Sequence, residues 1–191
     1  GDSEQVKVLA KFPLGQVPSK ELVVVPQPVY LQALENFPNY NDLVGLGPQI
    51  EELRDVASLF FTPKEMLEKY QQVPGAVLIH GPGGVGKTAL AKATAKEHGF
   101  EFREFTFTDI SARMVGDPQK KLQNIYDEAR DLGHPVLVFF DECDGLFRND
   151  AGGNEGVTLS LVTTLKRILG NPADYPNVLS IFATNSIKGF D

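Results

Sequence analysis

A glycine-rich segment is the part of the sequence whose residue types and spacing point most clearly to chemistry. Residues 81–88 read Gly-Pro-Gly-Gly-Val-Gly-Lys-Thr and fit the pattern G-x-x-x-x-G-K-[ST]. Glycines let backbone N–H groups close around phosphate oxygens, and the start of a following helix adds partial positive charge. Lys87 is then expected to reach the β- and γ-phosphates of a nucleotide, and the Thr88 hydroxyl to ligate Mg²⁺. The predicted nucleotide contacts are Gly81, Pro82, Gly83, Gly84, Val85, Gly86, Lys87, Thr88 and Ala89.

Two adjacent carboxylates follow the apolar run 136–140. In open α/β sheets, ligands bind beyond the carboxyl ends of the strands, where these side chains would lie. Asp141 is expected to hold the Mg²⁺ shell, and Glu142 to act as the general base that takes a proton from the attacking water. A merely solvated strand end is the alternative, which the upstream glycine-rich loop disfavours.

A third apolar run, 179–183, ends in Thr184 and Asn185. Asn185 is a candidate to orient the lytic water beside Glu142. In isolation, an ordinary turn asparagine would be the better interpretation. Its position behind the other two motifs favours the catalytic one, which gives Lys87, Glu142 and Asn185 as the predicted catalytic set.

Strand-like and helix-like runs alternate around these motifs, after a helical pattern that begins at Pro48 and a second helix start at 62–65. This alternation predicts an α/β fold in which helices cover both faces of a parallel sheet, a three-layer αβα sandwich. The predicted strands are 76–79, 100–107, 136–140 and 178–183, and the predicted helices between them are 88–97, 118–131 and 157–169.

Composition restricts the partners and the compartment. The chain has 18 basic and 25 acidic residues, a net charge of −7, which argues against nucleic acid as the main partner because such binding rests on phosphate neutralisation. A single cysteine, Cys143, allows no intrachain disulfide and fits the cytoplasm or another reducing compartment. No apolar run approaches about 18 residues, so no membrane span is expected.

The first 40 residues differ from the rest because they contain five prolines, a spacing that forbids a long helix. We interpret residues 1–40 as an N-terminal arm or linker that leads into a nucleotide-binding domain at 41–191.

In this order and spacing, the three motifs resemble the Walker A, Walker B and sensor 1 elements of the AAA+ ATPase family, and most closely those of the AAA proteins proper. The segment 42–46 resembles the stretch before the P-loop in that family, where backbone near Val44 and Gly45 meets the adenine. The resemblance implies a P-loop NTPase fold with sheet order 5-1-4-3-2. It also implies ATP or ADP with Mg²⁺ as the bound cofactors.

The resemblance extends to a loop through which the family grips protein substrates. The family's pore loop reads aromatic-hydrophobic-Gly, and Met114 and Val115 occupy the first two of these positions here. Methionine is apolar and adaptable enough to contact a polypeptide, while packing within its own loop is the alternative. The implied function is ATP-driven remodelling or unfolding of a protein substrate or adaptor by a homo- or hetero-oligomeric ring, commonly a hexamer.

Other functions remain as alternatives to this one. They are a nucleic-acid-directed ATPase of the clamp-loader or initiator type, and a scaffold that uses ATP for assembly with little hydrolysis. A small-molecule kinase is disfavoured because adjacent Asp141 and Glu142 point to water as the acceptor, and a G protein because no N-K-x-D motif occurs.

The resemblance also places an arginine finger and a helical lid beyond Asp191. We therefore expect residues 1–191 alone to bind nucleotide but to be nearly inactive in hydrolysis. Gly83 and Val85 stand where the family usually has Pro and Thr, and both replacements keep the loop feasible.

Overall fold

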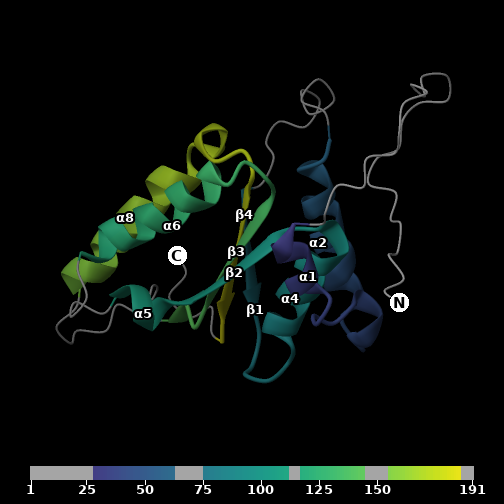
Figure 1. Ribbon diagram of the computed structural model, residues 1–191. Coiled ribbons are helices and arrows are strands. Elements are labelled where there is room, and N and C mark those ends of the chain that lie inside the picture. Colours follow the sequence, from purple (N-terminus) through teal and green to yellow (C-terminus); the bar gives the residue numbers. More distant parts are fainter. Residues whose placement is uncertain (1–27, 63–74, 112–116, 145–154, 186–191) are drawn as a thin grey trace, which may run out of the picture.

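The computed structural model describes residues 28–62, 75–111, 117–144 and 155–185. Helices and strands alternate along them as the sequence predicts, and the α/β fold is confirmed (Figure 1). In chain order the elements are α1 (Val29–Leu34), the 3₁₀ helix η1 (Tyr40–Asp42), α2 (Gly47–Leu59), β1 (Ala76–His80), α4 (Lys87–His98), β2 (Glu101–Thr106), α5 (Phe107–Ser111), α6 (Pro118–Asp131), β3 (Val136–Asp141), α8 (Glu155–Leu169), the 3₁₀ helix η3 (Pro172–Asp174) and β4 (Val178–Thr184).

The four strands form one parallel sheet in the order β1-β4-β3-β2. This is the predicted order 5-1-4-3-2 for the strands that the structure describes, and its expected fifth strand is not among the described residues. Because the strands are parallel, their carboxyl ends meet at one edge: His80 is level with Thr184, and Thr106 with Asp141. Glu142 and Asn185, which directly follow β3 and β4, therefore lie at the same edge of the sheet.

Two hydrophobic cores, one on each face of the sheet, explain why the central strands are apolar throughout. Val136, Val138 and Phe140 of β3 belong to the core under α6 and α8, whereas Leu137 and Phe139 belong to the core under α2 and α4. This alternation follows from the two-residue period of a strand. Figure 1 shows the resulting layers, with α6 and α8 on one side of the sheet and α1, α2 and α4 on the other.

The helices of the described segments are short. The longest, α8, has 15 residues, and none of the helices in these segments is long and apolar enough to cross a membrane.

Residues 28–40, the described part of the expected N-terminal arm, pack against the core under α2 and α4. The Tyr40 hydroxyl donates to Thr94 Oγ1 at 3.0 Å, and Lys96 Nζ donates to the carbonyl of Phe37 at 2.7 Å. Leu34 and Tyr40 are both buried in this contact. The domain boundary at residue 41 stays a prediction.

One predicted strand is longer than the observed one. The sequence predicts a strand over 100–107, but β2 ends at Thr106 and Phe107 begins α5. The Thr106 hydroxyl accepts a hydrogen bond from the backbone N–H of Asp109 at 3.2 Å, which caps the new helix. Phe107 stays in the core although it leaves the sheet, so its apolar character does not distinguish the two conformations. The predicted helix start at 62–65 falls largely outside the described residues.

Candidate nucleotide-binding and hydrolysis site

The glycine-rich loop connects the end of β1 to the first turn of α4. Gly84 has φ 80° and Gly86, the N-cap of α4, has φ 96°, both in the left-handed region that favours glycine. An added Cβ at Gly84 would meet no atom within 4 Å, so backbone conformation rather than crowding requires the glycine there. The helix starts directly at Lys87, followed by Thr88 and Ala89, so the N–H groups of this first turn are available to an anion.

Lys87 connects the glycine-rich loop to Asn185, the last residue of the third motif. Its Nζ donates to the carbonyls of Gly81 at 2.7 Å and Pro82 at 3.0 Å, and to Asn185 Oδ1 at 2.9 Å. The last contact joins residues 98 positions apart in the chain. The ends of β1 and β4 thus bring together two of the three predicted catalytic residues.

Thr88 and Asp141 meet at the same edge, where they fit a divalent cation. Thr88 Oγ1 donates to Asp141 Oδ2 at 3.1 Å. Hydroxyl and carboxylate oxygens are the hard ligands that Mg²⁺ prefers, and Mg²⁺ commonly keeps waters and phosphate oxygens as its other ligands. Within the described segments no group of three or more His, Cys, Asp or Glu side chains could hold a metal ion.

Glu142 stands out by its backbone. Its φ is 55°, and it is the only non-glycine residue with a positive φ in the part of the chain that the structure describes. A left-handed conformation costs a residue with a Cβ about 1–2 kcal/mol, and such strain concentrates at functional sites. The side chain is exposed, while the preceding Asp141 Oδ1 accepts a hydrogen bond from the Glu142 N–H at 2.8 Å. The strained turn thus presents the predicted base to solvent beside the cation ligand.

Cys143 fills space behind this turn. The side chain is fully buried, its Sγ donates to the carbonyl of Phe140 at 3.2 Å, and the backbone N–H of Cys143 donates to the carbonyl of Ala183 at 2.9 Å. Burial raises the pKa of the Cys143 thiol to about 12, so the thiol stays protonated and unreactive. This agrees with a packing role.

Asp144 is a functional candidate that our sequence reasoning missed. Its Oδ1 accepts from Thr184 Oγ1 at 2.8 Å and from the Asn185 N–H at 2.9 Å, and its Oδ2 accepts from Asn185 Nδ2 at 3.3 Å. The sequence shows only that a further carboxylate follows Asp141 and Glu142, because 141–144 reads Asp-Glu-Cys-Asp; it does not show which residues that carboxylate contacts.

The expected adenine-contacting segment lies next to the loop. An ideal Cβ on Gly86 would stand 3.6 Å from Leu46 Cδ1, which places Leu46 against the loop. Gly45 has φ 83°, and Val44 is 94% exposed. Contact of Val44 and Gly45 with adenine stays a prediction.

The structure thus pairs Lys87 with Asn185 and Thr88 with Asp141, and Glu142 follows Asp141 directly in the chain. In the loop, Pro82, Gly83, Gly84 and Val85 are exposed. Met114 and Val115, the predicted pore-loop residues, lie outside the described residues.

Comparisons with known proteins identify the family to which the chain belongs. Residues 77–191 match the family described as "ATPase family associated with various cellular activities (AAA)". Over 207 residues the chain is 34% identical to a proteasome-associated ATPase of Mycolicibacterium gilvum, an alignment that covers 97% of this chain and 32% of that protein. It is 32% identical to the protein of the same name from Nocardia farcinica, with 97% and 34% covered. The chain therefore spans about a third of the length of these relatives. These matches confirm the resemblance: the chain belongs to the AAA family of ATPases.

Proposed function

We propose that this chain binds ATP and ADP with Mg²⁺ at the carboxyl edge of its sheet and hydrolyses ATP to ADP and phosphate as part of the full-length protein. The observation that carries the proposal is the meeting of Lys87 with Asn185, and of Thr88 with Asp141, at hydrogen-bond distance. A phosphate-binding loop beside a cation site and a base matches what phosphoryl transfer to water requires.

Each side chain has a distinct task in this proposal. The loop N–H groups and Lys87 bind the phosphates, and Thr88 with Asp141 holds Mg²⁺, which neutralises charge on the phosphate oxygens. Asn185 orients the attacking water and Glu142 takes its proton. The water oxygen bonds to the γ-phosphorus, and the bond from that phosphorus to the bridging oxygen of ADP breaks.

The proposal for the whole protein goes further. Relatives named proteasome-associated ATPase support a ring-forming ATPase that remodels or unfolds a protein partner. Met114 and Val115 would contact that partner from the pore loop. The net charge of −7 favours this over a nucleic-acid-directed ATPase.

Calorimetric titration of ADP and of non-hydrolysable ATP into Lys87→Ala tests the nucleotide site. We expect affinity to fall at least about tenfold, because a charge-assisted hydrogen bond contributes about 1.5–3 kcal/mol. Lys92→Ala is the matched control: it removes a charge from the same helix, where Lys92 pairs with Glu104 at 2.9 Å away from the loop. Unchanged affinity in Lys87→Ala would refute the proposal.

Met114→Asp tests the protein-remodelling part in the full-length protein. The measured quantity is the amount of a tagged protein substrate unfolded per ATP hydrolysed. A charged side chain should abolish this coupling, whereas Met114→Leu keeps an apolar contact of similar volume and should preserve it. Normal coupling in Met114→Asp would return this residue to a packing role within its loop.

A further inference from the structure

We propose that Asp144 is a positioning residue for ATP hydrolysis, which fixes the side-chain amide of Asn185 so that its oxygen, not its nitrogen, faces the site. The inference rests on the proposed ATPase function, in which Asn185 orients the attacking water. Asp144 itself touches neither nucleotide nor water in this scheme and acts through Asn185.

The two neighbours of the Asn185 amide independently select the same orientation. The Asp144 carboxylate only accepts hydrogen bonds, so Nδ2 must face its Oδ2, at 3.3 Å. The Lys87 ammonium only donates, so Oδ1 must face Nζ, at 2.9 Å. In the reversed amide, two donors would oppose each other at Lys87 and two acceptors at Asp144. The amide orientation therefore follows from the chemistry of both partners.

Asp144 also holds the backbone that carries Asn185. Its Oδ1 accepts from the Asn185 N–H at 2.9 Å and from Thr184 Oγ1 at 2.8 Å, and Thr184 is almost fully buried. Three donors from two consecutive residues thus converge on one carboxylate. The end of β4 and the side chain that follows it are fixed by the same group.

The backbone that carries the Asp144 carboxylate is also held in place. The preceding residue, Cys143, is fully buried and donates its N–H to the carbonyl of Ala183 on β4 at 2.9 Å. This bond joins the chain after β3 to the neighbouring strand β4, at the residue before Thr184. Asp144 therefore connects the base-bearing turn at Glu142 to Asn185 across the two central strands.

The orientation decides what Asn185 can do with water. With Oδ1 toward the site, Asn185 accepts a hydrogen bond from one water O–H, which leaves the second proton for Glu142 and a lone pair for the phosphorus. A donating Nδ2 would instead occupy one of the two lone pairs and would leave one water proton without this acceptor. Loss of the Asp144 carboxylate should therefore impair turnover far more than nucleotide binding.

Asp144→Asn in the full-length protein provides the test. We expect kcat for ATP hydrolysis to fall about tenfold or more, with KM and the Kd for ADP within about twofold of the unmodified protein. Asp174 is an exposed carboxylate on η3 near the start of β4, and the control variant Asp174→Asn should leave kcat, KM and Kd unchanged. A merely structural role would instead lower the melting temperature and weaken ADP binding in parallel with kcat.

A double-mutant cycle separates action through Asn185 from an independent effect. Because Asp144 acts through Asn185, adding Asp144→Asn to Asn185→Ala should lower kcat no further than Asn185→Ala does alone. Multiplicative losses in the double variant would overturn the inference.

A spectroscopic measurement needs no change to Asp144 and does not depend on turnover. In ¹⁵N-labelled protein, the Asn185 side-chain NH₂ signals, assigned by their loss in Asn185→Ala, should show one proton shifted downfield and protected from exchange. Freely exchanging, unshifted NH₂ signals would overturn the inference even in an active enzyme. Protected signals in a protein without ATPase activity would support the Asp144 contact and refute the proposed function instead.

Discussion

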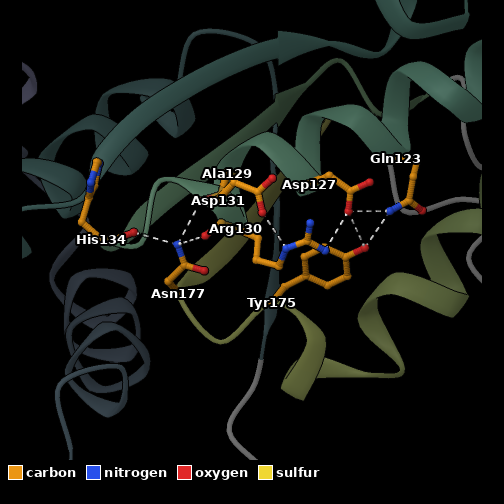
Figure 2. Close-up of polar contacts among 8 residues, drawn as sticks. All are labelled: Gln123, Asp127, Ala129, Arg130, Asp131, His134, Tyr175 and Asn177. Atoms are coloured by element: carbon orange, nitrogen blue, oxygen red, sulfur yellow. Dashed lines mark hydrogen bonds and ion pairs between the residues drawn. The ribbon is translucent and has the colours of Figure 1, made fainter.

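The two ends of the central strands β3 and β4 use the same kinds of polar side chains in different ways. At the amino end, Asn177 precedes β4, and its Nδ2 donates to the carbonyls of Ala129 at 2.9 Å and His134 at 2.8 Å (Figure 2). These carbonyls belong to the end of α6 and to the turn that leads into β3. Asn177 thus satisfies backbone groups that a helix end leaves without partners.

Tyr175 extends this amino-end network. Its hydroxyl accepts from Gln123 Nε2 at 2.7 Å and donates to Asp127 Oδ1 at 3.3 Å, and the Arg130 guanidinium lies 5.8 Å from its ring centroid. Figure 2 shows these side chains arranged along α6 beside the segment that enters β4. The network therefore joins α6 to the segment that enters β4.

At the carboxyl end, polar side chains from β3, β4 and the glycine-rich loop bond to one another and to nearby backbone groups. Lys87 contacts Asn185, Asn185 contacts Asp144, and Thr88 contacts Asp141, while the backbone at Glu142 is strained. The amino-end network satisfies backbone carbonyls and pairs side chains along α6, whereas the carboxyl-end network gathers the predicted catalytic and cation-binding residues beside a turn with a left-handed backbone at Glu142. The comparison predicts that changes at the amino end lower stability, and that changes at the carboxyl end lower activity.

Glu142→Gln should give the largest effect. The amide keeps the shape of the side chain but cannot take the proton from water, so ATP hydrolysis by the full-length protein should fall about 10²–10⁴-fold. Nucleotide affinity and the unfolding midpoint should stay close to those of the unmodified protein. Single-turnover hydrolysis measures the loss, and a rate within about threefold of the unmodified protein would show that Glu142 is not the base.

Asn177→Ala should have the opposite signature. The carbonyls of Ala129 and His134 lose their donor, which should lower the free energy of unfolding by about 1–2 kcal/mol. ADP affinity of the folded protein should not change. Urea denaturation measures the effect, with Asn171→Ala as the control, because exposed Asn171 donates to a single helix carbonyl, that of Arg167. Equal losses in the two variants would contradict a special role for the amino-end network.

Glu142→Gly should remove the predicted base and raise the free energy of unfolding, because it relieves the strained backbone at this position. Glycine adopts the left-handed conformation freely, and after its own unfolded-state entropy is subtracted, a gain of about 0.5–1 kcal/mol in unfolding free energy remains. Glu142→Gln is the reference, because it lacks the base but keeps the strained backbone. If the glycine variant is no more stable than the glutamine variant, the positive φ carries no strain.

The smallest expected effect is a pH dependence at Glu101, near the amino end of β2. Burial raises the pKa of this carboxyl, but hydrogen bonds from His134 at 2.8 Å and Arg103 at 3.0 Å outweigh it, so the pKa lies below its ordinary value of 4.5. A lowered pKa means that the ionised carboxylate stabilises the fold above pH 4.5, and that this contribution disappears as the pH falls through the lowered value.

Glu101→Gln tests this by urea denaturation across the acid range. The stability difference from the unmodified protein should be under about 1 kcal/mol, because the pair is partly exposed, and should close at low pH. His134→Ala in both backgrounds removes one donor and should shrink the pH-dependent part. A difference that grows as the pH falls would have the wrong sign.

Much of the fold could be predicted because its signals are local. The helix predicted over 118–131 has those bounds, since Pro118 and the Asp117 cap fix its start within a few residues. The buried run 136–140 indicates a central strand for a similar reason, because neighbours on both faces require apolar side chains at every position. The sequence predicts a strand at Phe107, which begins α5, because a buried aromatic side chain suits either element.

In the candidate site, too, features set by a local sequence pattern could be predicted, whereas contacts between distant residues could not. The glycine-rich loop is a contiguous pattern, and the left-handed φ values at Gly84 and Gly86 explain its glycines one by one. Asp144 escaped prediction because its partners, Thr184 and Asn185, lie about 40 residues further along the chain. No local pattern reports that distance.

By itself, the sequence determined most helices and strands, the phosphate-binding loop and the family, because each depends on a pattern within a short stretch of consecutive residues. Only the tertiary structure decided that Lys87 meets Asn185 and that Asp144 holds it, with β4 placed between β1 and β3. The physical reason is that strand order and register depend on how two whole cores pack against the sheet. Contacts between strand ends are a consequence of that packing and not of any single segment.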